Sequence, residues 1–292
     1  MRRLLGLLFL GFLLLPGGPA RAADWAAIDA VLGRPGAVQA AGVHRYGFPR
    51  SDLHVTLDGV AIRPALALGS WVAFREMDGR AEVMGDLVLT DEEVNPVLSR
   101  LLEGGLTITA LHNHLLRSTP ATMYMHIHGH GDATALATAI RQALQASATP
   151  LAAPAPAPPQ PALALKTDAL DRALGAKGQA NGGVYQFSIR RADQVMEDGA
   201  AVPPSLGLAI AINFQPTSGG RAVTTGDFVL LGSEVNPVLR ALRDHGIEVT
   251  ALHNHMSGEE PRLFFMHFWG NDDAGKLAAG LAAALARVNV AR

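Results

Sequence analysis

The sequence of 292 residues contains no cysteine. This absence excludes disulfide bonds, thiolate metal ligands, a cysteine nucleophile and a lipid attached to an N-terminal cysteine. Any metal ion must therefore be held by nitrogen and oxygen atoms, with methionine sulfur as the remaining soft ligand.

Charge is also scarce, because Asp, Glu, Lys and Arg make up only 17% of the chain and leave a net charge of −2. No segment carries a stripe of Lys and Arg, which argues against binding to nucleic acid. We expect a small molecule or a component of the cell envelope as the ligand.

Long hydrophobic runs are missing except near the N-terminus. There, two arginines precede an apolar run from Leu4 to Leu15, and a small-residue site ends at Ala22. This order is typical of a signal peptide. An uncleaved anchor is the less favoured alternative, because a membrane-spanning helix needs about 20 apolar residues. We predict that residues 1–22 are removed and that the mature protein is periplasmic or secreted, without a lipid or a membrane span.

What the chain does contain is an internal repeat. The stretch Ala-Leu-His-Asn-His begins at Ala110 and again at Ala251, an offset of 141 positions. The same offset superimposes residues 86–133 on residues 227–274 without a gap, and nearly half of the aligned positions are identical. The chain is therefore predicted to be a tandem duplication.

A segment rich in Ala and Pro separates the two copies, with six prolines between positions 150 and 161. Such a composition favours an extended spacer. The predicted parts are repeat domain 1 at residues 23–147, the linker at residues 148–165 and repeat domain 2 at residues 166–292. We expect the two repeats to pack on each other.

Each copy is predicted to contain both strands and helices. In copy one, the apolar pattern predicts strands at residues 66–74, 80–89, 107–114 and 123–130. Apolar residues three and four positions apart predict a helix from about Val94 to Leu102, and an Ala-rich helix follows Asp132. These elements indicate an α+β fold with a mostly antiparallel sheet and helices packed on one side.

Each copy carries three histidines at the same spacing, a His-x-His pair followed twelve residues later by a third histidine. Because this spacing persists in two copies that have otherwise diverged, we predict a metal site in one or both of them. The alternative is that these are ordinary sheet histidines with a structural role. The predicted ligands are His112, His114 and His126 in copy one, and His253, His255 and His267 in copy two.

Copy one has two further histidines on its last predicted strand. His128 and His130 stand where copy two has Trp269 and Asn271. Because side chains alternate between the faces of a strand, both should share a face with His126. We include His128 among the predicted ligands and leave His130 open.

The pairing of the two strands decides which histidines meet. A hairpin centred on Pro120 would place His114 opposite His126. The same register would place His112 opposite His128, with opposed Cβ atoms about 5 Å apart. Three or four imidazoles would then reach one ion, since Zn–N bonds are about 2.0–2.1 Å long.

A glutamate in each copy, Glu93 and its counterpart Glu234, is a candidate catalytic base near the histidines. The same residues also fit a structural role. Thr90-x-x-Glu93 has the form of a capping box, and a carboxylate in the first helical turn is favoured by the helix dipole.

Three blocks of copy one, each with a counterpart in copy two, resemble the LppY/LpqO family of exported bacterial proteins: Asp86–Leu98, Ala110–His114 and Met125–Asp132. The resemblance extends over the mature chain and implies export, but it implies no particular reaction. The family is named for lipoproteins, whereas this chain has no cysteine to carry a lipid.

A similarity at the level of the motif alone concerns acetolactate decarboxylase and related domains. These proteins carry His-x-His on one strand and a further histidine on the next, and the enzyme binds zinc with them. The similarity implies that the three histidines of each copy are zinc ligands, and it transfers geometry only.

We therefore expect an exported metalloprotein whose three-histidine zinc site leaves one coordination position open. Such an ion activates water or polarises a carbonyl, so a hydrolase or lyase acting on a small oxygen-rich substrate is the leading hypothesis. One alternative is a non-catalytic periplasmic buffer or carrier for zinc or copper, because Met123 and Met125 lie beside the histidines. Another is a cell-wall ligand-binding module with structural histidines. Whether the protein is an enzyme stays open.

Overall fold

The computed structural model describes residues 23–77, 79–153 and 162–291. The predicted signal peptide and the middle of the predicted linker lie outside these ranges. Each half forms a six-stranded antiparallel sheet, and the two sheets have matching strand orders. These orders are β1-β2-β5-β6-β8-β7 in the first half and β9-β10-β13-β14-β16-β15 in the second. The predicted α+β class is confirmed.

The elements of the first half are α1 (Trp25–Leu32), β1 (Ala37–Val38), η1 (Ala40–Gly42), β2 (His44–Pro49), β3 (Thr56–Leu57), β4 (Val60–Ala61), α2 (Pro64–Ala67), β5 (Gly69–Met77), β6 (Arg80–Leu89), α3 (Asp91–Glu103), β7 (Thr107–His112), β8 (Met123–Gly131) and α4 (Ala133–Leu144). Those of the second half are α5 (Thr167–Leu174), β9 (Gln179–Asn181), β10 (Val184–Ile189), β11 (Met196–Glu197), β12 (Ala200–Ala201), η2 (Pro204–Leu206), β13 (Ile210–Pro216), β14 (Arg221–Leu231), α6 (Gly232–Asp244), β15 (Glu248–His253), β16 (Leu263–Asp273) and α7 (Ala274–Leu285).

Most of these elements follow from local sequence. Helix α3 buries Val94, Val97 and Leu101, the apolar positions that predict it. Helix α4 begins where the Asp132 side chain accepts a hydrogen bond from Ala135 N at 2.8 Å, as an N-cap residue does. The strand predicted at residues 66–74 starts late, because Pro64 opens the short helix α2 and β5 follows it.

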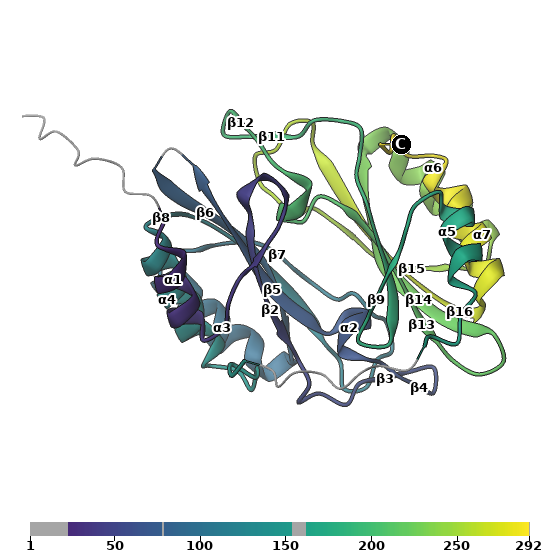
Figure 1. The fold of residues 1–292 in the computed structure, drawn as a ribbon, viewed down its shortest axis with the longest axis horizontal. Helices are drawn as coiled ribbons and strands as arrows, with labels where there is room; N and C mark the ends of the chain where they lie inside the picture. Colours follow the sequence, from purple (N-terminus) through teal and green to yellow (C-terminus); the bar gives the residue numbers. More distant parts are fainter. Residues whose placement is uncertain (1–22, 78, 154–161, 292) are drawn as a thin grey trace, which may run out of the picture.

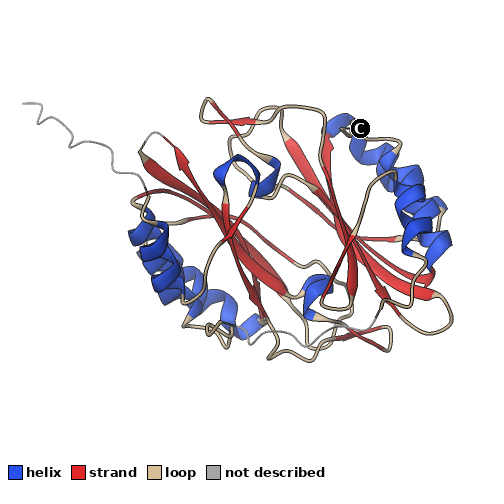
Figure 2. Cartoon of the chain, in the orientation of Figure 1, coloured by secondary structure: helices blue, strands red, loops and turns tan. Residues whose placement is uncertain are grey.

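The molecule has four layers, with α1, α3 and α4 on one outer side, α5, α6 and α7 on the other, and the two sheets facing each other in the middle (Figure 2). One apolar core lies between helices and sheet in each half. A third apolar cluster joins the halves and includes Leu57, Tyr124, Val223 and Trp269. The prediction that the repeats pack on each other is therefore confirmed (Figure 1).

Hydrogen bonds also cross between the halves. Trp269 Nε1 donates to Asp58 Oδ2 at 2.8 Å, and Thr250 Oγ1 donates to the carbonyl of His114 at 2.6 Å. At the start of the predicted linker, Arg34 donates to the carbonyls of Pro150 and Ala152, so these residues pack against the first half.

None of the helices in the described ranges is long and apolar enough to cross a membrane.

Candidate metal centre

The strands that carry the histidines pair in a different register from the one expected. His112 lies opposite Tyr124, and Ala110 lies opposite His126. The expected pairs of His114 with His126 and His112 with His128 are therefore wrong. In the observed register the hairpin is centred two residues closer to the N-terminus, and β7 ends at His112, so His114 lies beyond the paired strand.

The register still brings the outer histidines of each triplet together, because it shifts by an even number of residues and leaves their face unchanged. The Nε2 atoms of His112 and His126 lie 2.8 Å apart. In the second half, the Nε2 atoms of His253 and His267 lie 2.9 Å apart. The duplication thus reproduces the geometry as well as the sequence.

The two triplets do not form separate sites, because they stack on each other across the boundary between the halves. We call the resulting group the six-histidine centre. Its three closest pairs of rings, with centroid distances, are His112 with His253 (3.5 Å, stacked), His114 with His267 (3.7 Å, stacked) and His126 with His255 (3.7 Å, tilted by 40°).

Three overlapping sets of histidines in this centre could hold a metal ion, with their ligating nitrogens within 4.8 Å of one another. One set belongs to the first half alone, and the other two take histidines from both halves. The sets are His112, His114 and His126; His112, His253 and His267; and His126, His253 and His255.

Backbone hydrogen bonds determine which ring nitrogen faces the centre. Nδ1 of His253 lies 3.1 Å from the carbonyl of Asn254, and Nδ1 of His267 lies 2.9 Å from the carbonyl of Gly226. A carbonyl oxygen only accepts, so both Nδ1 atoms carry the hydrogen and both Nε2 atoms present a lone pair. Two lone pairs 2.9 Å apart repel unless a cation lies between them.

Burial makes a proton a poor candidate for that cation. It lowers the pKa of His112 to about 4 and that of His253 to about 3. The other four imidazoles also have a pKa well below the usual value, first because of burial and then because of the neighbouring imidazoles. Near neutral pH the centre therefore offers uncharged imidazoles, the form that binds metal ions.

Two buried carboxyl groups lie beside the centre. Asp86 Oδ2 is 3.8 Å from His114 Nε2, and Asp227 Oδ2 is 3.9 Å from His255 Nε2. Burial raises the pKa of Asp86 to about 8 and raises that of Asp227 well above its usual value. Among the described residues, Oδ1 of each aspartate and Nε2 of His114 and His255 have no hydrogen-bond partner. Buried polar atoms without partners are costly, which is consistent with a site that takes up a ligand.

Sequence reasoning missed these aspartates, although a signal was present. Asp86 and Asp227 occupy the same position in both copies, each directly after a glycine and before three apolar residues of its strand. In the sheet they lie directly opposite His126 and His267. A charged residue retained at a buried strand position in both copies would have identified them.

The two glutamates predicted as catalytic bases have structural partners. Glu93 forms an ion pair of 2.7 Å with the fully buried Arg50 and accepts hydrogen bonds from Thr90 N and Ala148 N. Glu234 has the matching ion pair of 2.6 Å with Arg191. In the described part of the chain, the hydrogen-bond and ion-pair partners of these glutamates include no imidazole, so the capping role accounts for their geometry.

His128 is not grouped with the six-histidine centre. A bulge in β7 shifts the pairing, so that Thr107 lies opposite His128. Nε2 of His128 lies 3.2 Å from Glu82 Oε1, and Glu82, His128 and His130 form a separate group of possible ligands.

The fold and the site define a duplicated α+β protein with buried histidine triads that could hold a metal ion. A family profile described as Domain of Unknown Function (DUF1259) matches residues 26–146 and again residues 168–287. The chain therefore belongs to this family and contains two copies of its domain, which confirms the predicted duplication. The resemblance to LppY/LpqO proteins stays a prediction.

No match was found among curated proteins. Two solved structures are similar over 86% of this chain and 88% of theirs. One is a trimeric bacterial microcompartment shell protein, PduB, with 16% sequence identity and a TM-score of 0.22. The other is EtuB from Clostridium kluyveri, with 10% identity and a TM-score of 0.20.

Proposed function

We propose that the six-histidine centre binds a divalent metal ion, zinc by preference, and that both halves supply ligands to it. The observation that carries this proposal is the pair of Nε2 atoms, 2.9 Å apart in His253 and His267, whose Nδ1 atoms are both held by carbonyls. Two nitrogens that are each about 2.0–2.1 Å from one tetrahedral zinc ion lie about 3.3 Å apart, so the pair needs to open only slightly to hold such an ion.

Elemental analysis of the purified protein tests this proposal. The protein produced with ample zinc should retain metal after dialysis, and the double variant His112→Ala/His253→Ala should contain fewer equivalents of metal than the wild type. The matched control is His54→Ala, because His54 is exposed and lies outside the centre. Absence of metal from the wild type, or an unchanged metal content in the double variant, would overturn the proposal.

We infer hydrolase or lyase chemistry on a small oxygen-rich substrate as the leading activity. A zinc ion with an open position would supply an activated water or a polarised carbonyl. Asp86 and Asp227 support this inference, because a carboxyl group with a raised pKa can hold a proton near neutral pH and deliver or accept it. Variants Asp86→Asn and Asp227→Asn that bind metal normally but lose turnover would be the expected result.

The second candidate function is a carrier or buffer for zinc or copper. It is favoured by the overlap of the three ligand sets, since neighbouring sets share His112, His126 or His253. Competition with a coloured chelator separates the two functions. A single tightly held ion supports the enzyme, whereas several ions that exchange within seconds support the carrier. Protein that folds and captures cell-wall fragments equally well in chelator would instead support the ligand-binding module.

We also propose that the protein is exported to the periplasm or secreted, as the sequence of residues 1–22 predicts. Expression of the full chain in a bacterium, followed by cell fractionation and N-terminal sequencing, tests this. Mature protein in the periplasm or medium that starts near Ala23 is expected. Cytoplasmic protein that retains Met1 would contradict it.

A further inference from the structure

A second group of possible metal ligands lies on β6 and β8 of the first half. Glu82 lies directly opposite His130 in the sheet, with His128 two residues earlier on the same strand. The Oε1 atom of Glu82 is 3.2 Å from His128 Nε2 and 4.0 Å from His130 Nε2. One carboxylate oxygen therefore faces two imidazoles.

The second half adds a carboxylate to this group from the end of β11. Glu197 Oε2 lies 3.9 Å from His128 Nε2, and Glu197 is only 7% exposed. Within the described residues, this oxygen is buried and has no hydrogen-bond partner. Because a buried carboxylate oxygen without a partner is unfavourable, its position beside the imidazoles suits it to bind a cation.

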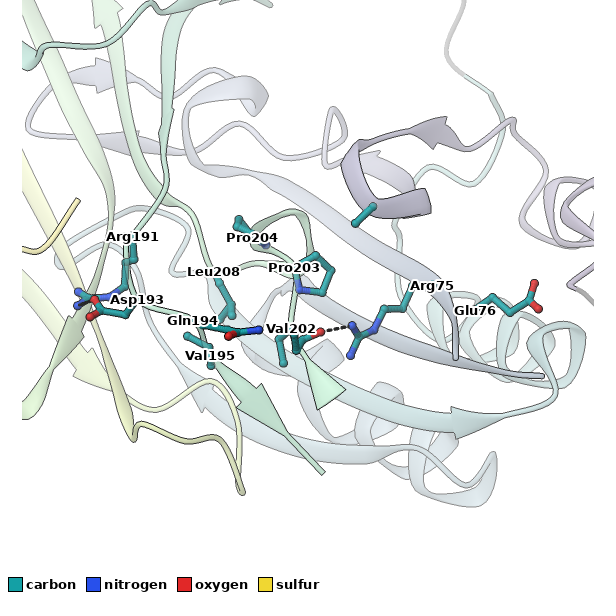
Figure 3. A pocket seen from close by; sticks show the side chains of 12 residues that line it. Arg75, Glu76, Arg191, Asp193, Gln194, Val195, Val202, Pro203, Pro204 and Leu208 are labelled. Carbon is teal, nitrogen blue, oxygen red and sulfur yellow. Dashed lines mark hydrogen bonds and ion pairs between the residues drawn. The ribbon is translucent and has the colours of Figure 1, made fainter. Parts of the chain in front are cut away.

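The ion pair that Arg75 forms with Glu82 leaves one carboxylate oxygen of Glu82 available to a metal ion. The guanidinium of Arg75 pairs with Glu82 Oε2, which leaves Oε1 free to face the histidines. Arg75 also donates to the carbonyl of Ala201 and lines a pocket of about 410 Å³ between the halves (Figure 3). Solvent can reach the side chain of Arg75 through this pocket.

The duplication provides an internal control for this group. The positions equivalent to Glu82, His128 and Glu197 in the other half are Val223, Trp269 and Leu57. These three residues are buried together in the apolar cluster that joins the halves. Apolar side chains can therefore fill these three positions of the domain. Packing alone does not account for the polar residues Glu82, His128 and Glu197 at the equivalent positions.

We propose that these residues form a second site for a divalent metal ion, distinct from the six-histidine centre and without a counterpart at the equivalent positions of the duplication. We call it the carboxylate–histidine site. Its ligands are Glu82, His128, His130 and Glu197. Two imidazoles and two carboxylates suit zinc, manganese or ferrous iron, and the fixed oxygen of Glu82 gives the ion a defined position.

Titration of the metal-free full chain with Co²⁺, followed by absorption spectroscopy and elemental analysis, tests this site. Glu197→Gln and His130→Ala should each bind one equivalent less than the wild type. The matched control is Glu76→Gln, because Glu76 lines the same pocket but is not a ligand. Equal stoichiometry in the wild type and both variants would overturn the proposal and leave only an ion-pair network.

Two further variants separate this proposal from the one on the six-histidine centre. His112→Ala/His253→Ala should retain the equivalent bound at the carboxylate–histidine site, whatever happens at the centre. The triple variant Glu82→Val/His128→Trp/Glu197→Leu copies the apolar arrangement of the second half. It should fold, as thermal unfolding can show, and lose that equivalent. A triple variant that folds and still binds the additional ion would refute the assignment.

Discussion

The imidazole of His112 stacks on that of His253 with their ring centroids 3.5 Å apart, although the two residues occupy equivalent positions in different copies of the domain. This contact places the candidate centre on the approximate symmetry axis of the duplication. Each half supplies three of the six histidines. Two of the three candidate ligand sets therefore exist only when both halves are present.

Loss of one histidine from either half should reduce metal binding at the centre. We expect His253→Ala to weaken metal binding at least tenfold, because His253 belongs to two of the three ligand sets. His255→Ala should have a smaller effect, since His255 belongs to only one. Competition with a chelator of known affinity measures both. Equal affinities for His253→Ala and the wild type would contradict the shared centre.

Zinc should stabilise the folded protein. A ligand present at about 100 times its Kd adds about 2.7 kcal/mol to the free energy of unfolding if it binds only the folded state. For a protein of this size the Tm should rise by about 5–10 °C. Differential scanning calorimetry with zinc and with chelator measures the shift. The variant His112→Ala/His253→Ala should lose most of it.

The buried ion pair of Arg50 and Glu93 should matter for stability and not for metal binding. Arg50→Ala would leave Glu93 without its partner, which typically lowers the free energy of unfolding by about 3–5 kcal/mol. Arg100→Ala is the matched control, because the Arg100–Glu103 pair is largely exposed and should contribute less than about 1 kcal/mol. Denaturant unfolding compares them. A Glu93→Gln variant of normal stability but without turnover would restore the catalytic role of Glu93.

The same ion pair predicts how stability changes with pH. Although burial acts to raise the pKa of Glu93, hydrogen bonds from Arg50, Ala148 and Thr90 lower it below its usual value. A group whose pKa is lower in the folded state stabilises that state above its unfolded pKa, and this contribution is lost as pH falls through the folded pKa. The stabilisation contributed by Glu93 should therefore be lost as pH falls below about 4.3. The stability of Glu93→Gln should depend less steeply on pH in that range.

Much of the fold follows from local sequence, since the apolar spacing of Val94, Val97 and Leu101 predicts helix α3 and the repeat predicts two equal halves. The candidate ligands also follow, because strand alternation places His112 and His126 on one face under any even shift of register. The register itself depends on where β7 leaves the sheet, which tertiary packing decides.

The joint use of both triplets could not be predicted from the sequence. The periodicity of apolar residues does not determine how two sheets pack against each other. The contact between the rings of His126 and His255 therefore could not be predicted from the sequence. The approach of Glu197, at the end of β11 in the second half, to His128 could not be predicted either. Both features arise from contacts between residues far apart in the chain.

The most direct test of the shared centre is a crystal structure of the zinc-loaded full chain with anomalous diffraction recorded at the zinc edge. The account predicts an anomalous peak within about 2.0–2.1 Å of Nε2 atoms from both halves, with His253 and His267 joined by His112. A centre without an anomalous peak, or ions each bound only by histidines of one half, would contradict it.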